Sequence, residues 1–236
     1  MPVSETFNTD CLLYMKDIPD NHFDLSLVDP PYGIGGDSLH SDRAEKNHLH
    51  SNRALSGAGK LKNRVLNTMN TKWDISPTEE YFLELFRASK QQIIWGGNYF
   101  PLPPTRCIIC WDKVQPWENF SQIEYAWTSF DYPAKLFRFD NRTGGKIHPT
   151  EKPIALYKWL LTNFAKQGDK IFDSHLGSGS SRIAAWDLGF DFYACELDKD
   201  YHEAQEKRFQ NHIQQASLFS FSEQTEKTEI IQNTLF

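Results

Sequence analysis

The amino-acid sequence predicts an α/β fold, built on a mostly parallel, twisted sheet with helices on both faces. Strand-like and helix-like segments alternate along the chain, which is the pattern of parallel sheets whose connections are helices. Two strand-like runs end in residues suited to a ligand site, and open α/β sheets bind ligands at the carboxyl ends of their strands. The 236 residues fit one large domain of this class.

Short apolar segments separated by polar residues, Gly or Pro define the individual elements. A helix is expected to begin just after Asp10, whose carboxylate could cap it. The apolar run Phe23–Val28 predicts the first clear strand. The other expected helices are 81–90, 154–166 and 182–188, and the other expected strands are 93–95, 106–111, 170–172 and 190–195.

Asp29-Pro30-Pro31-Tyr32 directly follows the first clear strand. The two prolines fix the backbone and lack an N–H, so the local carbonyls remain free acceptors. The tyrosine offers a flat face on which a base can stack. Acceptors for an amino group beside a platform for its ring suit chemistry on the exocyclic amine of a nucleobase. The alternative is an ordinary strand exit with a solvated Asp29.

A glycine-rich loop far downstream indicates a nucleotide-like ligand. Asp173 follows a short strand, Gly177 and Gly179 lie in the loop, and the next strand ends at Glu196. Glycines let the backbone approach a ligand, and an acid about 20 residues further on can bind ribose hydroxyls. The sequence contains neither GxGxxG nor the phosphate loop GxxxxGK[ST]. S-adenosylmethionine, which has a ribose, an adenine and a carboxylate but no phosphate, fits this pattern best.

Three motifs together resemble those of the DNA amino-methyltransferases. They are the segment 29–32, the loop that begins at Asp173, and His148-Pro149-Thr150-Glu151-Lys152-Pro153. Their order resembles the permuted β group, and the resemblance runs from about residue 8 to about residue 210. Residues 95–100 also resemble a family segment, a strand beside the catalytic one. The resemblance implies a Rossmann-like, S-adenosylmethionine-dependent methyltransferase fold, and it implies a setting of restriction and modification.

The resemblance implies site-specific methylation of N6 of an adenine flipped out of double-stranded DNA, because DPPY accompanies that reaction and SPPY accompanies methylation of cytosine N4. The carboxylate and the first proline carbonyl of the motif would accept the two amino hydrogens. The implied catalytic residues are Asp29, Pro30, Pro31 and Tyr32. The implied cofactor residues are Asp10, Thr150, Lys152, Asp173, His175, Gly177, Ser178, Gly179 and Glu196.

Each of these assignments has an alternative. Asp10 serves equally well as a helix cap, and Lys152 could be an ordinary solvated lysine. Ser174 and His175 replace the proline and phenylalanine of the family pattern DPFxGSGT. That phenylalanine packs against the methionine part of the cofactor; a histidine can stack there too, and it can titrate near neutral pH. A packing substitution is the simplest interpretation. An N4-cytosine methyltransferase and a catalytically inactive DNA-binding relic are the alternative functions.

Two segments are expected to contact DNA, although the net charge is −6. Residues 37–72 are basic and directly follow the catalytic motif, so we expect a mobile loop over the active site that meets phosphates. A solvated insertion is the alternative. Residues 113–146 fall where the family places target recognition. The candidate DNA contacts are Arg43, Lys46, Arg53, Lys60, Lys62, Arg64, Lys135, Arg138 and Arg142, and the aromatic residues expected in the core are Tyr125, Trp127, Phe130, Phe137 and Phe139.

No metal site or membrane span is expected. Cys107 and Cys110 form a CxxC pair within a strand-like run, and no second pair or nearby histidines complete a zinc site. Both cysteines are expected to be buried and reduced. No apolar run is long enough to cross a bilayer, and the N-terminus does not resemble a signal peptide. We expect a cytoplasmic protein of a prokaryotic or phage-infected cell.

A flexible tail, residues 216–236, is expected to follow one catalytic domain that spans residues 1–215. Two QxxLF patterns occur here, one from Gln215 to Phe219 and one from Gln232 to Phe236. They resemble the pentapeptide by which bacterial replication proteins dock on the sliding clamp, where a glutamine and a Leu-Phe pair fill an apolar pocket. Chance, or packing of the last helix on the domain, is the alternative. A homodimer is a further hypothesis, because relatives of this group often pair.

Overall fold

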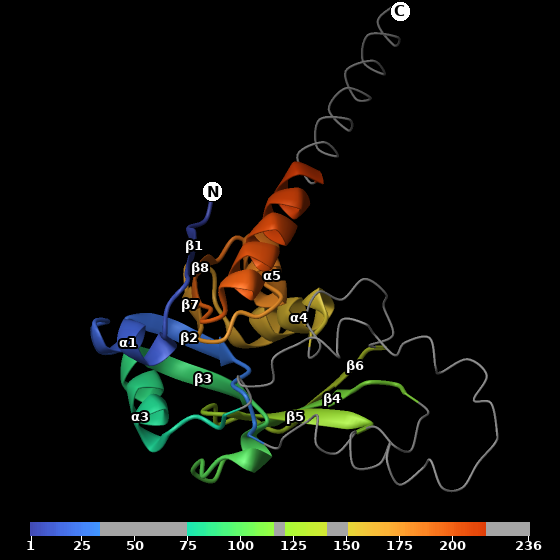
Figure 1. Ribbon diagram of the computed structural model, residues 1–236. Coiled ribbons are helices and arrows are strands. Elements are labelled where there is room, and N and C mark those ends of the chain that lie inside the picture. The colour runs from blue at the N-terminus through green and yellow to red at the C-terminus, as the bar shows by residue number, and fades with distance from the viewer. Residues whose placement is uncertain (34–74, 116–120, 141–150, 216–236) are drawn as a thin grey trace, which may run out of the picture.

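The computed structural model describes residues 1–33, 75–115, 121–140 and 151–215, which form one eight-stranded sheet with helices on both faces (Figure 1). The strand order is β1-β8-β7-β2-β3-β5-β4-β6. The strands are β1 (Ser4–Phe7), β2 (Phe23–Val28), β3 (Ser89–Trp95), β4 (Ile108–Asp112), β5 (Ile123–Thr128), β6 (Lys135–Arg138), β7 (Lys170–Asp173) and β8 (Asp191–Cys195). The helices are α1 (Cys11–Lys16), α3 (Glu79–Ala88), α4 (Ile154–Phe164), α5 (Ser180–Leu188), the 3₁₀ helix η3 (Gly97–Tyr99) and a last helix at 199–215.

Most of the described strands run in the same direction, so their carboxyl ends lie at the same edge of the sheet. Neighbouring strands pair in parallel from β1 through β8, β7 and β2 to β3, and β4 pairs in parallel with β6. Among the described strands, β5 alone is antiparallel to its neighbours β3 and β4. The carboxyl ends of the other seven strands therefore meet the amino end of β5. We call this edge the carboxyl edge.

The strand order has a switch point between β2 and β7, because the strands that follow these two in the chain lie on opposite sides of the pair. From β2 the chain continues outward to β3, whereas from β7 it continues outward to β8 on the other side. Leu25 pairs with Ile171, and Ser26 with Phe172, so the two strands lie directly side by side. Open α/β sheets bind ligands at such a switch point, outside the carboxyl ends of the strands.

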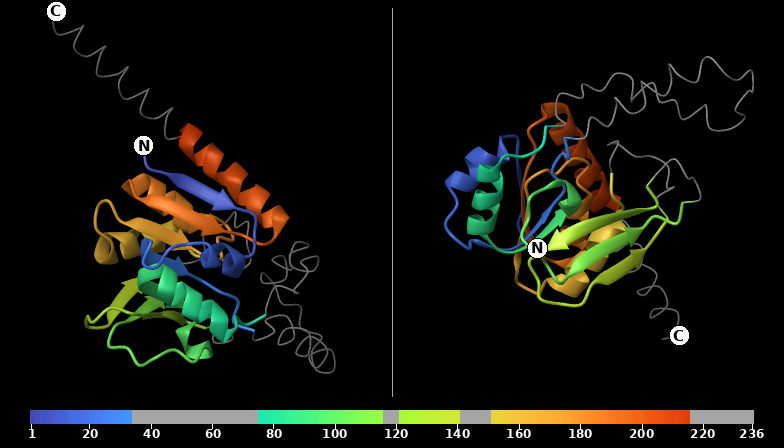
Figure 2. Two further views of the ribbon diagram at one scale, coloured as in Figure 1. Left: turned by 90° about the vertical axis from the view of Figure 1, so that its left-hand side faces the viewer. Right: turned by 90° about the horizontal axis from the view of Figure 1, so that it is seen from below.

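Apolar side chains of the central strands point to two cores, one on each face. On β3, Ile93 and Trp95 pack on the face of α4 and α5, whereas Ile94 packs on the face of α1 and α3. β7 divides in the same way, with Ile171 on the first face and Phe172 on the second. Figure 2 shows the two helical layers edge-on. With both faces buried, the central strands are rigid supports for the residues at their ends.

The predicted fold class is confirmed, and β2 has the predicted bounds. The helix expected at 81–90 is wrong at its end, because α3 stops at Ala88 and β3 already begins at Ser89, before the expected strand 93–95. The strand expected in the segment 95–100 does lie beside the catalytic strand, because β3 pairs with β2, but its expected extent across these residues is wrong. β3 ends at Trp95, Gly96 takes a left-handed conformation at φ +67°, and η3 follows. The other predicted elements differ from their expected bounds by at most one or two residues at each end.

The expectations for the cysteines and for the aromatic core residues are only partly confirmed. Cys107 is buried, whereas Cys110 is only partly buried, so the prediction of two buried cysteines is half wrong. Trp127 lies in the core as expected, and the other four predicted core aromatics are partly buried. The described residues contain no cluster of three potential metal ligands. No helix among them is long and apolar enough to span a membrane.

The last helix is fastened to the sheet by a buried arginine of α5. The guanidinium of Arg182 donates hydrogen bonds to Ser4 Oγ at 3.0 Å and Gln205 Oε1 at 3.0 Å. It also forms an ion pair with Glu206 and lies 3.8 Å from the ring centre of Phe209. The side chain is only 5% exposed. One residue thus joins β1, α5 and the last helix.

Replacing Arg182 by Met is expected to lower the free energy of unfolding by about 2–4 kcal/mol, because buried partners lose their donor. The exposed Arg106, which pairs with the exposed Asp131, provides a matched control. Arg106→Met is expected to stay within about 0.5 kcal/mol of wild type. Urea unfolding measures both. Equal effects of the two substitutions would show that Arg182 does not fasten the last helix.

Candidate active site at the carboxyl edge

The catalytic candidate Asp29 follows β2 at the carboxyl edge, and two donors hold its carboxylate. The hydroxyl of Tyr32 donates to Oδ1 at 2.8 Å, and the ammonium of Lys152 donates to Oδ2. Lys152 is 4% exposed, so the alternative of a solvated lysine is wrong. Asp29 of the segment 29–32 and Lys152, in the described part of the segment 148–153, therefore meet through an ion pair. A contact of Lys152 with the cofactor stays a prediction.

A second carboxylate, not predicted from the sequence, completes a row of alternating charges. Glu124 Oε2 at the amino end of β5 lies 3.3 Å from Lys152 Nζ, and Lys113 pairs with the same carboxyl group. Burial favours the neutral amine of Lys152, but the carboxylates of Asp29 and Glu124 hold its pKa above the usual value. Burial would raise the pKa of Glu124, but Lys152 and Lys113 hold it below the usual value. Lys152 and Glu124 therefore stay charged near neutral pH. We call Asp29, Lys152, Glu124 and Lys113 the charge row.

Two glycines after β3 make room for the aromatic part of the site. A Cβ on Gly96 would lie 2.2 Å from the ring of Tyr32, and a Cβ on Gly97 would lie 2.5 Å from Trp127 Cβ. Tyr32 stacks on Tyr99, with ring centres 4.9 Å apart and planes 20° apart. One face of the predicted stacking residue is therefore already covered, and Tyr99, which is 45% exposed, is an additional aromatic residue of the site.

The loop after β7 is organised around two acids. Asp173 accepts hydrogen bonds from the Ser181 hydroxyl at 2.6 Å and from the backbone N–H of His175 at 3.1 Å. Burial raises the pKa of Asp173 to about 7, against the effect of these two donors. Glu196 accepts from the backbone N–H of Gly177 at 2.8 Å. Both acids therefore fix the loop conformation, and the loop lies beside Asp29 because β7 pairs with β2.

Ser178 and Gly179 face the last helix in addition to forming the loop. The carbonyl of Ser178 accepts from Arg208 at 2.8 Å, and Arg208 also pairs with Glu151 at 2.9 Å. Gly179 has φ +76°, and a Cβ on it would lie 3.2 Å from Gln205 Cβ. Packing alone thus accounts for these two loop residues, and their contact with a cofactor stays a prediction.

Asp10 caps α1, as one of its two interpretations requires. Its carboxylate accepts from the backbone N–H groups of Leu12 at 2.7 Å and Leu13 at 3.1 Å. Asn8, two residues earlier, donates to the carbonyl of Glu196 at 2.8 Å. The start of α1 is therefore tied to the end of β8 at the carboxyl edge. The helix cap is confirmed, and a cofactor contact of Asp10 stays a prediction.

The described DNA candidates lie on the edge strand β6. Arg138 ends this strand at the carboxyl edge and is exposed, where it pairs with Asp112 at 2.8 Å. Lys135 begins the strand, away from that edge. The loop predicted over 37–72 lies outside the described residues, and so do the two LF pairs of the tail. Outside them also lie Thr150, Arg43, Lys46, Arg53, Lys60, Lys62, Arg64 and Arg142.

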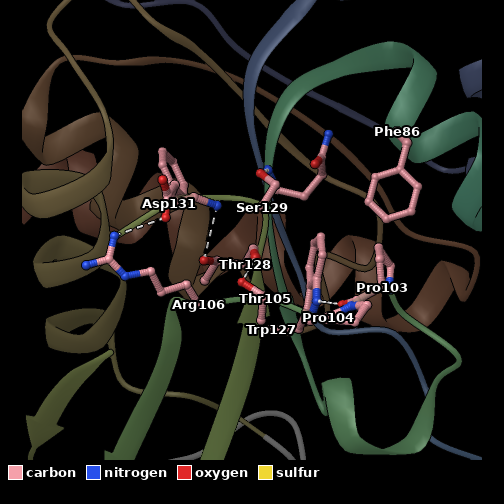
Figure 3. A pocket seen from close by; sticks show the side chains of 11 residues that line it. Phe86, Pro103, Pro104, Thr105, Arg106, Trp127, Thr128, Ser129 and Asp131 are labelled. Carbon is pink, nitrogen blue, oxygen red and sulfur yellow. Dashed lines mark hydrogen bonds and ion pairs between the residues drawn. The ribbon is translucent and has the colours of Figure 1, made fainter. Parts of the chain in front are cut away.

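A surface pocket lies elsewhere, where β5 ends and β4 begins (Figure 3). Its lining includes Phe86, Arg106 and Trp127, and the indole N–H of Trp127 donates to the carbonyl of Pro103 at 2.6 Å. None of the predicted catalytic or cofactor residues that the structure describes lines it. The candidate site is therefore the carboxyl edge between β2 and β7, not this pocket.

Substitution of Gly96 tests the close packing of the aromatic residues. Gly96→Ala is expected to lower the free energy of unfolding by about 1–3 kcal/mol more than Gly168→Ala, because only the first methyl group meets a ring. Gly168 is a matched control, with φ +93° and no atom within 4 Å of the place that an added methyl group would take. Urea unfolding compares the two variants. Equal destabilisation by the two substitutions would mean that the position of the Tyr32 ring does not require a glycine at residue 96.

Comparison with known proteins identifies the family. A family model described as DNA methylase matches residues 89–207, about half of the chain. The type II methyltransferase M2.DpnII of Streptococcus pneumoniae is 26% identical over 148 residues, which cover 62% of this chain and 52% of that protein. The chain therefore spans about half the length of this relative. The type II methyltransferase M2.MboI of Moraxella bovis is 22% identical, with 86% of each chain covered.

Solved structures share the fold. TTHA0409 of Thermus thermophilus, complexed with S-adenosyl-L-methionine, superposes with a TM-score of 0.54 at 18% identity, covering 89% of this chain and 94% of that one. The cytosine-N4-specific PvuII DNA methyltransferase gives a TM-score of 0.58 at 13% identity, covering 88% and 87%. The family match and the fold agree with the arrangement of motifs at the carboxyl edge. This chain belongs to the DNA methylase family.

Proposed function

We propose that this protein is a DNA adenine-N6 methyltransferase that uses S-adenosylmethionine and acts on an adenine flipped out of double-stranded DNA. One observation carries the proposal. Asp29 and Tyr32 follow β2 beside the loop after β7, at the switch point of the sheet of a DNA methylase. A group that holds an amine thus lies next to a loop suited to a nucleoside.

The loop residues fit S-adenosylmethionine. Glu196 keeps unused lone pairs after accepting backbone N–H bonds, and a carboxylate at this position suits two ribose hydroxyls. Gly177, at φ +52°, brings the backbone close to that carboxylate. A structural neighbour, TTHA0409, is complexed with S-adenosyl-L-methionine. When bound, this cofactor supplies a methyl group on a sulfonium, which is a strong electrophile.

The chain then has to align an aromatic amine, which is a poor nucleophile. Each oxygen of Asp29 holds one donor and keeps a lone pair, so the carboxylate can accept an amino hydrogen, with the Pro30 carbonyl as the second acceptor. This turns the nitrogen lone pair toward the methyl group. With the cofactor bound, the amine would take the methyl group as the carbon–sulfur bond breaks. S-adenosylhomocysteine would be the leaving group, and the extra amino proton would pass to water. The negative charge of Asp29 stabilises the positive charge that develops on the nitrogen.

The choice of adenine rests on the motif residue, aspartate rather than serine. Methyl transfer from labelled S-adenosylmethionine to unmethylated DNA, followed by nucleoside chromatography, tests it. Label in N6-methyladenine is the expected result. Label in N4-methylcytosine would overturn the choice of base. Cofactor binding without label in DNA would overturn DNA as the substrate, and the absence of both binding and transfer would favour an inactive relic.

Asp29→Asn is expected to lower kcat for methyl transfer by about 100-fold or more, because the charge that faces the amine is lost while the shape remains. Affinity for S-adenosylmethionine is expected to stay within about threefold of wild type, since the carboxylate holds the amine and not the cofactor. Single-turnover kinetics and calorimetry measure the two quantities. Turnover near the wild-type rate would reject the role of Asp29.

Glu124→Gln is expected to lower kcat by about tenfold. Lys152 would then pair with Asp29 alone and would compete more strongly with the substrate amine for the Asp29 carboxylate. The exposed Glu203, which pairs with Lys199 on the last helix, is a matched control. Glu203→Gln is expected to leave kcat unchanged. An unchanged kcat in both variants would show that the charge row does not tune the catalytic carboxylate.

The wider organisation follows from the same proposal. Residues 1–215 form the catalytic domain, and residues 113–146 supply target recognition. Arg138, which lies at the carboxyl edge, is a proposed DNA contact in this region. The basic segment 37–72 meets DNA phosphates next to the catalytic motif.

The tail with its two QxxLF patterns tethers the enzyme to a sliding clamp, and pull-down with purified clamp tests this. Loss of binding when both Leu-Phe pairs become Ala is expected, whereas equal binding would reject the tether.

A further inference from the structure

The two residues by which the loop departs from the family pattern contact each other and a tyrosine of α3. The hydroxyl oxygens of Tyr81 and Ser174 are 2.7 Å apart. Ser174 Oγ lies 2.8 Å from Nδ1 of His175. Tyr81 and Ser174 are 3% and 2% exposed. Tyr81, Ser174 and His175 are thus joined in one hydrogen-bonded network.

The donors and acceptors of these three side chains determine which atom donates in each hydrogen bond. Ser174 Oγ is the one acceptor near the Tyr81 hydroxyl among the described residues, so Tyr81 has to donate to it. Burial keeps the pKa of Tyr81 well above its usual value, so this proton stays on the tyrosine. Ser174 then donates to Nδ1, because both other arrangements leave a buried hydroxyl proton without an acceptor: that of Tyr81 if the order is reversed, and that of Ser174 if its oxygen accepts from both neighbours.

The direction fixes the tautomer of the histidine. Nδ1 is an acceptor, so the ring hydrogen lies on Nε2. The partner of Nε2 is Cys11 Sγ, 4.0 Å away at the start of α1, which is a weak acceptor that an oxygen or nitrogen of a ligand would displace. The ring packs against Tyr81 edge-on, with centres 5.5 Å apart. Burial lowers the pKa of His175 to about 4, which agrees with a neutral ring.

We propose that Tyr81 and Ser174 are positioning residues that hold His175 as a neutral ring with an Nε2–H donor for the cofactor. This rests on the proposed use of S-adenosylmethionine. The adenine nitrogens and the carboxylate of that cofactor are acceptors for such a donor. A neutral ring also avoids repulsion with the sulfonium cation. The changes at 174 and 175 therefore form one unit with Tyr81 and not two separate packing substitutions.

A double-mutant cycle between Tyr81→Phe and His175→Phe tests the unit. Each change removes polar atoms and keeps an aromatic ring. Calorimetry is expected to show that Tyr81→Phe weakens S-adenosylmethionine binding about three- to tenfold in the wild-type background. In the His175→Phe background, where the bond between Tyr81 and Ser174 remains, Tyr81→Phe is expected to change affinity less than about twofold.

The tautomer is measured without the cofactor. Nitrogen-15 spectra of the eight histidines, with His175 assigned by its loss in His175→Phe, are expected to show the Nε2–H form in wild type. Tyr81→Phe should increase the Nδ1–H form. Tyr193→Phe is the matched control, since no hydrogen bond of its hydroxyl occurs among the described residues, and it should leave both readouts unchanged.

Three outcomes would overturn the proposal. The first is a wild-type Nδ1–H tautomer, and the second is a loss of affinity from Tyr81→Phe that is equal in both backgrounds. Either result would leave the proposed function standing, provided that wild type binds S-adenosylmethionine. The third is a wild-type protein that binds no S-adenosylmethionine, which would overturn the proposed function together with the role of this unit.

Discussion

The parallel pairing of β2 with β7 is the constraint on which the site depends. Asp29 follows the end of β2 and Asp173 ends β7, so these two residues, far apart in the chain, lie at the same edge because the two strands pair in parallel. Apolar cores on both faces hold the two strands rigid, so the groups at their ends keep fixed positions. Catalysis by alignment needs such rigidity, since small displacements of the reacting atoms are costly. The fold thus supplies the pre-organisation, and the loops supply the chemistry.

Charge is balanced at this edge by alternation. A buried ammonium such as that of Lys152 is stable only beside carboxylates, and here it lies between Asp29 and Glu124. The antiparallel direction of β5 is what brings Glu124 to the carboxyl edge, because its amino end lies where the other strands finish. The mixed sheet therefore has a functional consequence. An all-parallel sheet would place the start of that strand at the opposite edge.

Local patterns predicted the parts of the site that are continuous in the sequence. The apolar run before Asp29 and the Gly177 loop could be recognised because each element and its functional end are adjacent. Glu124 and Tyr81 could not, since their roles arise from partners on other elements and no spacing marks them. The two glycines at 96 and 97 were a signal for Tyr99, because paired glycines after a strand indicate close packing.

The proposed function makes the two halves of the site separable: the end of β2 would hold the amine, and the end of β8 would hold the cofactor. Calorimetric titration of S-adenosylmethionine into the Asp29→Asn and Glu196→Gln proteins tests this division most directly. The account predicts affinity close to wild type for the first protein and a loss of about tenfold or more for the second. Wild-type affinity in Glu196→Gln, or an equal loss in both proteins, would contradict it.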